Sequence, residues 1–155
     1  MATKNLSNYD AKKVPAADKY KFAVIVSDWN TEITEGLYKG CYETLITHKA
    51  KTKNITRINV PGSFELVYAA AKALKTKKYD AIIVLGGVIQ GDTKHFDFVC
   101  TGVTNGIAQL NTLAQAPVIF GLLTDNNMQQ AKDRSGGKLG NKGVECAVTA
   151  IKMIG

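Results

Sequence analysis

The sequence is poor in the residues that build metal centres and disulfide frameworks. Its 155 residues include two histidines and three cysteines, and Cys41, Cys100 and Cys146 lie far apart with no C-x-x-C pair. This spacing excludes the usual zinc-site and dithiol redox motifs, and it predicts reduced thiols. Reduced thiols favour a cytoplasmic location over an oxidising compartment.

Long apolar runs are also missing. Hydrophobic residues make up 45% of the chain, as in an ordinary globular protein, but no run approaches the roughly 20 residues of a membrane-spanning helix. The N-terminus is polar, so we expect no secretory signal and no membrane partner. The length fits one compact domain.

Acidic residues are outnumbered, with 13 of them against 20 lysines and arginines, which gives a formal net charge of +7. Clustered cations can bind nucleic acid by neutralising phosphates. Here the lysines gather in the first 21 residues and around residues 49–53 and 75–78, without the repeated aromatics of a base-stacking platform. We therefore predict a solvated tail and solvated helix ends and no nucleic-acid partner, with attraction of small anionic substrates as the alternative.

Hydrophobic periodicity predicts strands that alternate with helices. Residues 1–21 lack such a period and are expected to form an extended arm or a disordered tail before a single domain at residues 22–155. The predicted strands cover residues 22–26, 55–60, 81–85 and 117–123. The predicted helices cover residues 32–48, 61–74, 93–115, 124–131 and 142–153, with a glycine-rich loop at residues 134–143. This alternation predicts an α/β fold in which helices flank both faces of a four-stranded parallel sheet.

One stretch, AIIVLGGVIQGDTKHFDFVC at residues 81–100, combines a buried strand, a glycine-rich turn and a helix start. Gly87 to Gly91 and Thr93 would offer backbone N–H groups and a positive helix end to an anion. His95 falls in the first turn of the helix, where the dipole disfavours the imidazolium. It is therefore a candidate general acid or base, although a histidine near a helix start is more often structural.

Other strand ends carry further candidates. Trp29 follows the first strand and could stack on a planar heterocycle, as could Phe120, although such aromatics commonly pack against helices. Glu65, near the start of the second helix, either favours the helix dipole or accepts hydrogen bonds from ligand hydroxyls. Arg134, after the fourth strand, either clamps a phosphate or belongs to a surface loop.

Four motifs together resemble the lumazine synthase family. They are VSDWNTEIT at residues 26–34, NVPGSFELVYAA at 59–70, GGVIQGDTKHFDFVC at 86–100 and QAKDRSGGKLGNKGVECA at 130–147. The resemblance implies a flavodoxin-like three-layer sandwich. It also implies condensation of 5-amino-6-(D-ribitylamino)uracil with 3,4-dihydroxy-2-butanone 4-phosphate to 6,7-dimethyl-8-ribityllumazine, the penultimate step of riboflavin biosynthesis. Phosphate and water are released, and no metal or organic cofactor is used.

The same resemblance assigns roles to particular positions. His95 matches the catalytic histidine. The pyrimidine and its ribityl chain would contact Trp29, Ser63, Phe64, Glu65, Gly87, Val88, Ile89 and Phe120, with Phe120 contributed by a neighbouring subunit. The butanone phosphate would contact Asp92, Thr93, Arg134 and Lys142. The chain departs from the family at Trp29, where Phe is common, which should enlarge the stacking surface. It also departs at Gln90, where a basic residue is frequent, which should weaken attraction for the phosphate.

The resemblance further implies a homo-oligomer with active sites between adjacent subunits. Family members form pentamers, some of which assemble into icosahedral shells, and association with riboflavin synthase is a further expectation. The loop RSGGKLGNKG is short, as in shell-forming members, which predicts a 60-subunit assembly. Two alternatives remain open: a riboflavin synthase of the archaeal type, which shares the fold, and a non-catalytic flavin or lumazine binder.

Overall fold

The computed structural model describes residues 5–155, and its centre is one sheet of four parallel strands in the order β2-β1-β3-β4. The strands are β1 (Phe22–Ser27), β2 (Ile55–Val60), β3 (Ala81–Ile89) and β4 (Val118–Asp125). Every residue of β1 is buried, as are the first seven of β3. Central strands covered on both faces are expected to be apolar throughout, so the predicted parallel sheet is confirmed.

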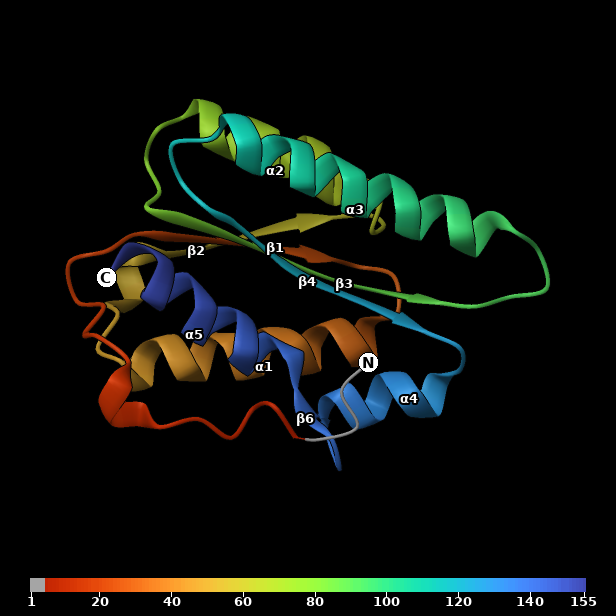
Figure 1. Ribbon diagram of the computed structural model, residues 1–155, viewed down its shortest axis with the longest axis horizontal. Coiled ribbons are helices and arrows are strands. Elements are labelled where there is room, and N and C mark those ends of the chain that lie inside the picture. The colour runs from red at the N-terminus through yellow and green to blue at the C-terminus, as the bar shows by residue number, and fades with distance from the viewer. Residues whose placement is uncertain (1–4) are drawn as a thin grey trace.

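Helices cover both faces of this sheet (Figure 1). The α-helices are α1 (Thr31–Thr47), α2 (Glu65–Lys75), α3 (His95–Leu113), α4 (Met128–Arg134) and α5 (Lys142–Ile154). Figure 1 shows α2 and α3 on one face, with α1, α4 and α5 on the other. This is the predicted α/β three-layer sandwich of the flavodoxin type.

The sheet divides the apolar core in two because successive side chains of a strand point to opposite faces. Val24 of β1 belongs to the cluster formed with α1 and α5, where Leu37 is fully buried. The next residue, Ile25, belongs to the cluster on the opposite face with Leu66 of α2 and Val103 of α3. Each helix is therefore fixed by the apolar stripe that the periodicity predicts.

Asn141 ties α5 to α1. Its side-chain Oδ1 accepts a hydrogen bond from the Gly143 N–H at 2.8 Å, which caps α5, and its Nδ2 donates to the Gly36 carbonyl of α1 at 2.8 Å. A side chain at Gly40 would collide with Asn141, because an added Cβ would lie 2.5 Å from its Cγ. Small residues thus allow the two helices to pack closely around one capping side chain.

The predicted N-terminal arm spans residues 1–21, of which residues 1–4 lie outside the described part. Residues 5–21 run along α1 and α5 and contain one short 3-10 helix, η1 (Ala11–Lys13). Val14 and Ala17 are buried in the core on the α1 and α5 side. The Tyr9 hydroxyl lies 2.9 Å from Nε2 of His48, and burial lowers the pKa of that histidine.

The structure corrects the prediction that β3 ends at Leu85 and is followed by a glycine turn. Strand β3 continues to Ile89, because β4 pairs with it up to the partners Ile89 and Asp125. Gly86 therefore lies inside the strand. Its missing side chain leaves room for neighbours, since an added Cβ would lie 2.8 Å from the Ser63 hydroxyl and 2.9 Å from Leu66.

Three further boundaries differ from the prediction. The expected helix at residues 124–131 is instead α4, because β4 continues to Asp125 and Asn127 caps the helix by accepting from the Gln130 N–H. Helix α2 begins at Glu65, since residues 61–64 form a turn. The glycine-rich loop contains a small antiparallel pair, β5 (Ser135–Gly137) and β6 (Gly140–Asn141), and a second 3-10 helix, η2 (Thr52–Asn54), precedes β2.

Candidate active site

The carboxyl ends of β1, β2 and β3 meet at one edge of the sheet and, together with the start of α3, border a pocket of about 720 Å³. In parallel α/β sheets this edge is where ligands bind. The structure brings the following predicted residues together around the pocket: Trp29, Ser63, Phe64, Glu65, Gly87, Val88, Ile89 and His95. Asn30, Phe98 and Val99 complete its lining.

Trp29 is held at the mouth of the pocket by the loop that follows β2. Its backbone N–H donates to the Pro61 carbonyl at 3.0 Å. The indole packs against Gly62, where an added Cβ would lie 2.6 Å from two ring carbons. The side chain is 68% exposed, so the ring presents a broad apolar face beside the pocket. That face is available for stacking on a planar ligand.

Glu65 and Ser63 form the side of the pocket at the start of α2. Glu65 lies in the first turn, and its Oε2 accepts a hydrogen bond from the Gly62 N–H at 2.9 Å. Its other carboxylate oxygen makes no hydrogen bond within residues 5–155, so it is free to accept one from a ligand. Ser63 is buried, with its hydroxyl 3.5 Å from the Gly87 carbonyl.

The end of β3 forms the floor of the pocket with an unpaired strand edge. Pairing with β1 ends at the partners Val26 and Leu85, whereas pairing with β4 continues to Ile89. From Gly86 to Ile89 the edge that faces β1 therefore has no strand partner. The Gly87 carbonyl on this edge already accepts hydrogen bonds from side chains, but the other backbone groups that face this way can offer donors and acceptors to a planar ligand, as they would to another strand.

Asn30 braces this edge and was missed by sequence reasoning. It adopts the left-handed conformation with φ of 60°, which Asn tolerates better than most residues. In that conformation its Nδ2 donates to the Gly87 carbonyl at 3.0 Å. Asn30 thus links the loop after β1 to the floor of the pocket. Its position at a strand end was the one available signal.

His95 is the first residue of α3 and lies at the side of the pocket. Its backbone N–H donates to the Thr93 hydroxyl at 3.3 Å, and its imidazole is exposed. The preceding residue, Lys94, makes no side-chain capping bond to the helix. Phe98 follows one turn later on the same side of α3, so sequence spacing from His95 could have identified it. Asp92 and Thr93 are exposed in the loop between β3 and α3 and do not line the pocket.

The remaining predicted residues gather elsewhere on the chain. Phe120 and Lys142 line a second cavity of about 370 Å³, which shares no lining residue with the first. Arg134 donates to the Leu139 carbonyl at 2.9 Å and lies 2.8 Å from Oε1 of Glu145, which also lines this cavity. A single chain therefore holds two separate groups of predicted site residues.

Glu145 organises the second group and was also missed. Its carboxylate is largely buried and lies between two cations, with the Lys142 ammonium 3.0 Å from Oε2 and the Arg134 guanidinium near Oε1. Burial pushes the pKa of Glu145 upward, but the two cations outweigh it and hold the pKa below its ordinary value. The spacing of Lys142 and Glu145 on α5 was a signal in the sequence, since residues three apart face each other.

Asp125 lies where β4 ends and joins the electrostatics of this group. Burial raises its pKa, and the positive charge of Arg134 partly opposes that effect. Arg134 is thus influenced by two carboxylates. Within residues 5–155, no group of three or more His, Cys, Asp or Glu side chains is arranged to hold a metal ion. Nor does any helix of that range have the length and apolar character needed to cross a membrane.

Comparison with known proteins identifies the family of this chain. The profile of the 6,7-dimethyl-8-ribityllumazine synthase family matches residues 19–155. This chain belongs to that family. A 6,7-dimethyl-8-ribityllumazine synthase from Flavobacterium johnsoniae is 59% identical over 155 residues, which cover 99% of this chain and 82% of the relative. Another from Phocaeicola vulgatus is 56% identical over 150 residues, with 97% and 89% covered.

Membership of the lumazine synthase family confirms the resemblance carried by the four motifs. The family match includes all four strands and both groups of predicted residues. It begins at residue 19, so most of the N-terminal segment lies outside the matched region. The strand-end pocket and the Glu145 cluster are therefore both parts of the family domain.

Proposed function

We propose that this protein is a transferase of riboflavin biosynthesis that makes 6,7-dimethyl-8-ribityllumazine. It condenses 5-amino-6-(D-ribitylamino)uracil with 3,4-dihydroxy-2-butanone 4-phosphate and releases phosphate and water. The observation that carries this proposal is the strand-end pocket, in which an exposed indole, an unpaired strand edge and a histidine surround one space. These are groups suited to a planar, hydrogen-bonding ring that must exchange protons.

The pyrimidine substrate fits the pocket by stacking and by backbone recognition. We assign the ring to the face of Trp29, with its polar edge along Gly87, Val88 and Ile89. The ribityl chain then extends towards the start of α2, where Ser63, Phe64 and Glu65 line the wall. The second carboxylate oxygen of Glu65 would accept a hydrogen bond from a ribityl hydroxyl.

The butanone phosphate requires the second group of residues. We assign its phosphate to Arg134 and Lys142, together with Asp92 and Thr93 at the start of α3. Guanidinium and ammonium groups stabilise a phosphate, and the helix N-terminus adds a favourable dipole. Glu145 contacts both cations and partly neutralises them. An arriving phosphate would compete with this carboxylate for the two cations.

The two groups are separate within one chain, which supports a site built between adjacent subunits. We propose a pentamer in which Phe120, Arg134 and Lys142 of one subunit approach the His95 pocket of the next. The aromatic side chains of Phe64, Tyr68 and Phe98 are exposed near that pocket and would be covered by the neighbour. The short connection through β5 and β6 supports further assembly into a 60-subunit shell.

The chemistry begins when the substrate amine attacks the ketone and water leaves to give an imine. Elimination then expels phosphate and leaves an enol, which tautomerises to a second carbonyl. The ribityl-bearing amine attacks this carbonyl and closes the ring with loss of another water. His95 transfers protons during these steps, while Arg134 stabilises the departing phosphate. Since the amine is already nucleophilic, much of the acceleration comes from holding both substrates in register.

Formation of the fluorescent lumazine product from the two substrates tests the activity directly. We expect His95→Ala to lower kcat without abolishing turnover, and Arg134→Ala chiefly to raise KM for the butanone phosphate. A fully active His95→Ala enzyme would remove the assignment as proton carrier. Riboflavin formed from lumazine alone would instead identify a riboflavin synthase, and tight lumazine binding without turnover would identify a binding protein.

Mixed oligomers test the shared site. His95→Ala and Arg134→Ala chains are unfolded, mixed and reassembled, and kcat/KM for the butanone phosphate is measured. If the two residues come from adjacent subunits, about one quarter of the sites in a random ring are intact, so activity rises above that of either variant alone. No rise would place both residues in the same subunit's site.

Two finer properties belong to this proposal. We assign the enzyme to the cytoplasm, which its free cysteines Cys41, Cys100 and Cys146 support. We also propose association with riboflavin synthase, which would consume the lumazine product. Co-sedimentation of the two purified proteins tests that association, and light scattering distinguishes a pentamer from a 60-subunit shell.

A further inference from the structure

The end of the molecule opposite the pocket carries a dense positive charge. We define the basic end as residues 18–21, 48–54, 72–80 and 152–155, which precede β1, β2 and β3 or end α1, α2 and α5. It contains ten lysines and two aspartates, a formal charge of +8, compared with +7 for the whole chain. The lysines are Lys19, Lys21, Lys49, Lys51, Lys53, Lys72, Lys75, Lys77, Lys78 and Lys152.

These lysines are exposed, and none takes part in the six ion pairs found among residues 5–155. Lysines commonly compensate the negative ends of helix dipoles, and three α-helices end within the basic end. Each helix end carries about half a negative charge, so three of them offset only a small part of the positive charge. Most of this charge is therefore left without a partner.

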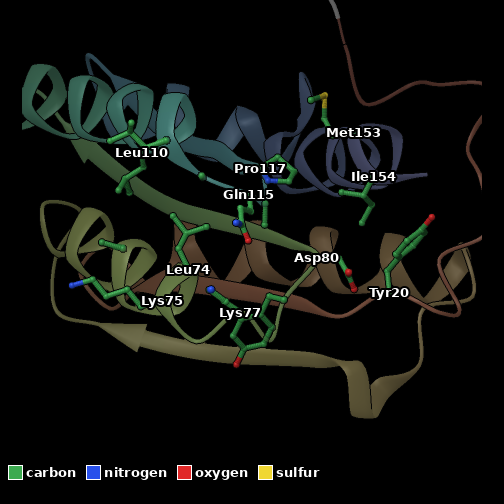
Figure 2. Close-up of a pocket in the computed structure, with 15 residues that line it drawn as sticks. Tyr20, Leu74, Lys75, Lys77, Asp80, Leu110, Gln115, Pro117, Met153 and Ile154 are labelled. Carbon is green, nitrogen blue, oxygen red and sulfur yellow. The ribbon is translucent and has the colours of Figure 1, made fainter.

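An apolar groove of about 810 Å³ opens at the same end (Figure 2). Leu74 of α2, Leu110 of α3 and Met153 of α5 converge on it, together with Pro117 before β4. Two of its apolar side chains are unusually open to solvent, with Leu113 82% exposed and Met153 64% exposed. Lys75 and Lys77 lie at its border, so the groove combines an apolar floor with a basic edge.

A second, smaller cleft extends the basic surface beyond the groove. It measures about 650 Å³, and Lys21, Lys53 and Lys78 line it. Tyr79 lines both hollows, so they are adjacent. Asp80, the one carboxylate among residues 5–155 that lines the groove, already accepts a hydrogen bond from the Lys21 N–H at 2.7 Å. A ligand that contacts both hollows must be extended and carry several negative charges.

We infer that the groove and the cleft bind an extended acidic segment of a partner protein, with apolar side chains in the groove and carboxylates on the lysines. Among residues 5–155, only Tyr20 and Tyr79 bring aromatic rings to the groove, so it lacks the row of rings on which successive nucleic-acid bases stack. No arginine is present in the basic end to recognise phosphates or guanine with its fork of donors. The surface is hollow, whereas a bilayer requires an apolar face that protrudes into it. Charge complementarity and the apolar floor together favour a peptide.

Fluorescence anisotropy with the assembled protein and three labelled twelve-residue peptides tests this inference. The first peptide alternates Glu and Leu, the second alternates Glu and Ser, and the third alternates Lys and Leu. We expect the Glu-Leu peptide to bind with a Kd in the micromolar range, at least tenfold more tightly than either other peptide. Equal binding of the Glu-Ser peptide would show attraction by charge alone and overturn the assignment of the groove.

Charge-reversal variants locate the surface. The double variant Lys75→Glu and Lys77→Glu should weaken the Glu-Leu peptide at least tenfold. A matched double variant, Lys12→Glu and Lys39→Glu, makes the same change in net charge outside the basic end and should change the Kd less than twofold. Lumazine formation should stay normal in both, which confirms that they fold. Equal weakening in the two variants would overturn the inference.

Two further measurements distinguish a bound peptide from three other occupants of the groove: a second copy of the chain, a nucleic acid and a membrane. In Leu113→Cys, the new thiol should react with a maleimide in the assembled oligomer. A protected thiol would show that another copy of the chain covers the groove, which would overturn the inference. A single-stranded oligonucleotide or a phosphatidylserine vesicle that binds more tightly than the peptide, and loses binding in the Lys75 and Lys77 double variant, would also overturn it.

Discussion

Replacing Asn30 by Asp changes one atom of the side chain that braces the pocket floor. The substitution removes the Nδ2 donor that lies 3.0 Å from the Gly87 carbonyl, and it places a carboxylate oxygen there instead. Asp tolerates the left-handed backbone that Asn30 adopts, so the backbone is not strained by the change. The effect therefore comes from the lost hydrogen bond and from repulsion between two oxygen atoms.

The expected magnitude follows from these two contributions. Losing a hydrogen bond to a partly buried carbonyl costs about 1 kcal/mol, and the unfavourable oxygen contact adds roughly 1 kcal/mol more. A destabilisation of about 2 kcal/mol lowers Tm by roughly 4–8 °C in a domain of this size. If the same loss applies to the bound pyrimidine, its KM rises about tenfold to thirtyfold, since 1.4 kcal/mol corresponds to a factor of ten.

Steady-state kinetics and a thermal melt measure both effects. We expect KM for the pyrimidine to rise while KM for the butanone phosphate and kcat change less than about threefold, because Arg134 and His95 are untouched. Asn30→Gly is the matched control, since it removes the donor without adding charge or strain and should raise KM only about fivefold. An unchanged KM in Asn30→Asp, or an Asn30→Gly enzyme that is equally impaired, would refute this account of the pocket floor.

Three other perturbations have defined outcomes. Glu145→Gln should flatten the acid side of the curve of Tm against pH. The pKa of Glu145 in the folded protein lies below 4.5, so its carboxylate stabilises the fold above pH 4.5, and this stability is lost as the pH falls through the folded pKa. An unchanged curve would contradict the cation contacts. Burial raises the pKa of the Cys146 thiol to about 12 and that of the Cys41 thiol well above its ordinary value. Iodoacetamide at pH 8 should therefore alkylate neither thiol until urea unfolds the protein, and the mass of the intact protein measures this. Lys49→Gly should raise Tm by about 2–4 °C because Lys49, which follows the α1 C-cap His48, has φ of 72°. A lower Tm would show that its left-handed backbone is not strained.

The layers of the fold were predictable because they depend on local periodicity. Apolar residues spaced along α1 and continuous apolar runs in β1 and β3 each allow few alternatives. The end of β3 was not predictable in this way. Gly86 and Gly87 are local signals for a turn, but pairing with β4 holds them in an extended strand. That pairing joins residues 36 positions apart, which no local pattern reports.

Prediction of the site shows a similar division. Trp29, Glu65 and His95 each follow a strand, and parallel strands bring their carboxyl ends to one edge. Their meeting around one pocket follows from topology alone. The role of Asn30 depends on a carbonyl 57 residues away, and that of Glu145 on burial between two cations, so neither has a signature in its own neighbourhood. Family resemblance named Phe120 and Arg134 and assigned Phe120 to a neighbouring subunit, and within one chain both residues lie in a group separate from the His95 pocket.

The unpaired edge of β3 affects how mutations act on this pocket. Peptide groups are the same in every amino acid except proline, so a substitution at Val88 or Ile89 changes the side chain and leaves the hydrogen-bonding atoms in place. A point mutation can remove the imidazole of a histidine or the guanidinium of an arginine together with its function. No substitution except proline can remove the hydrogen-bonding groups of the backbone. The pocket floor can therefore tolerate drift in its sequence while its pattern of donors and acceptors stays constant. Proline is the exception, and Gly87→Pro and Ile89→Pro would test the two peptide N–H groups on the open edge, since the peptide groups of Gly86 and Val88 face β4.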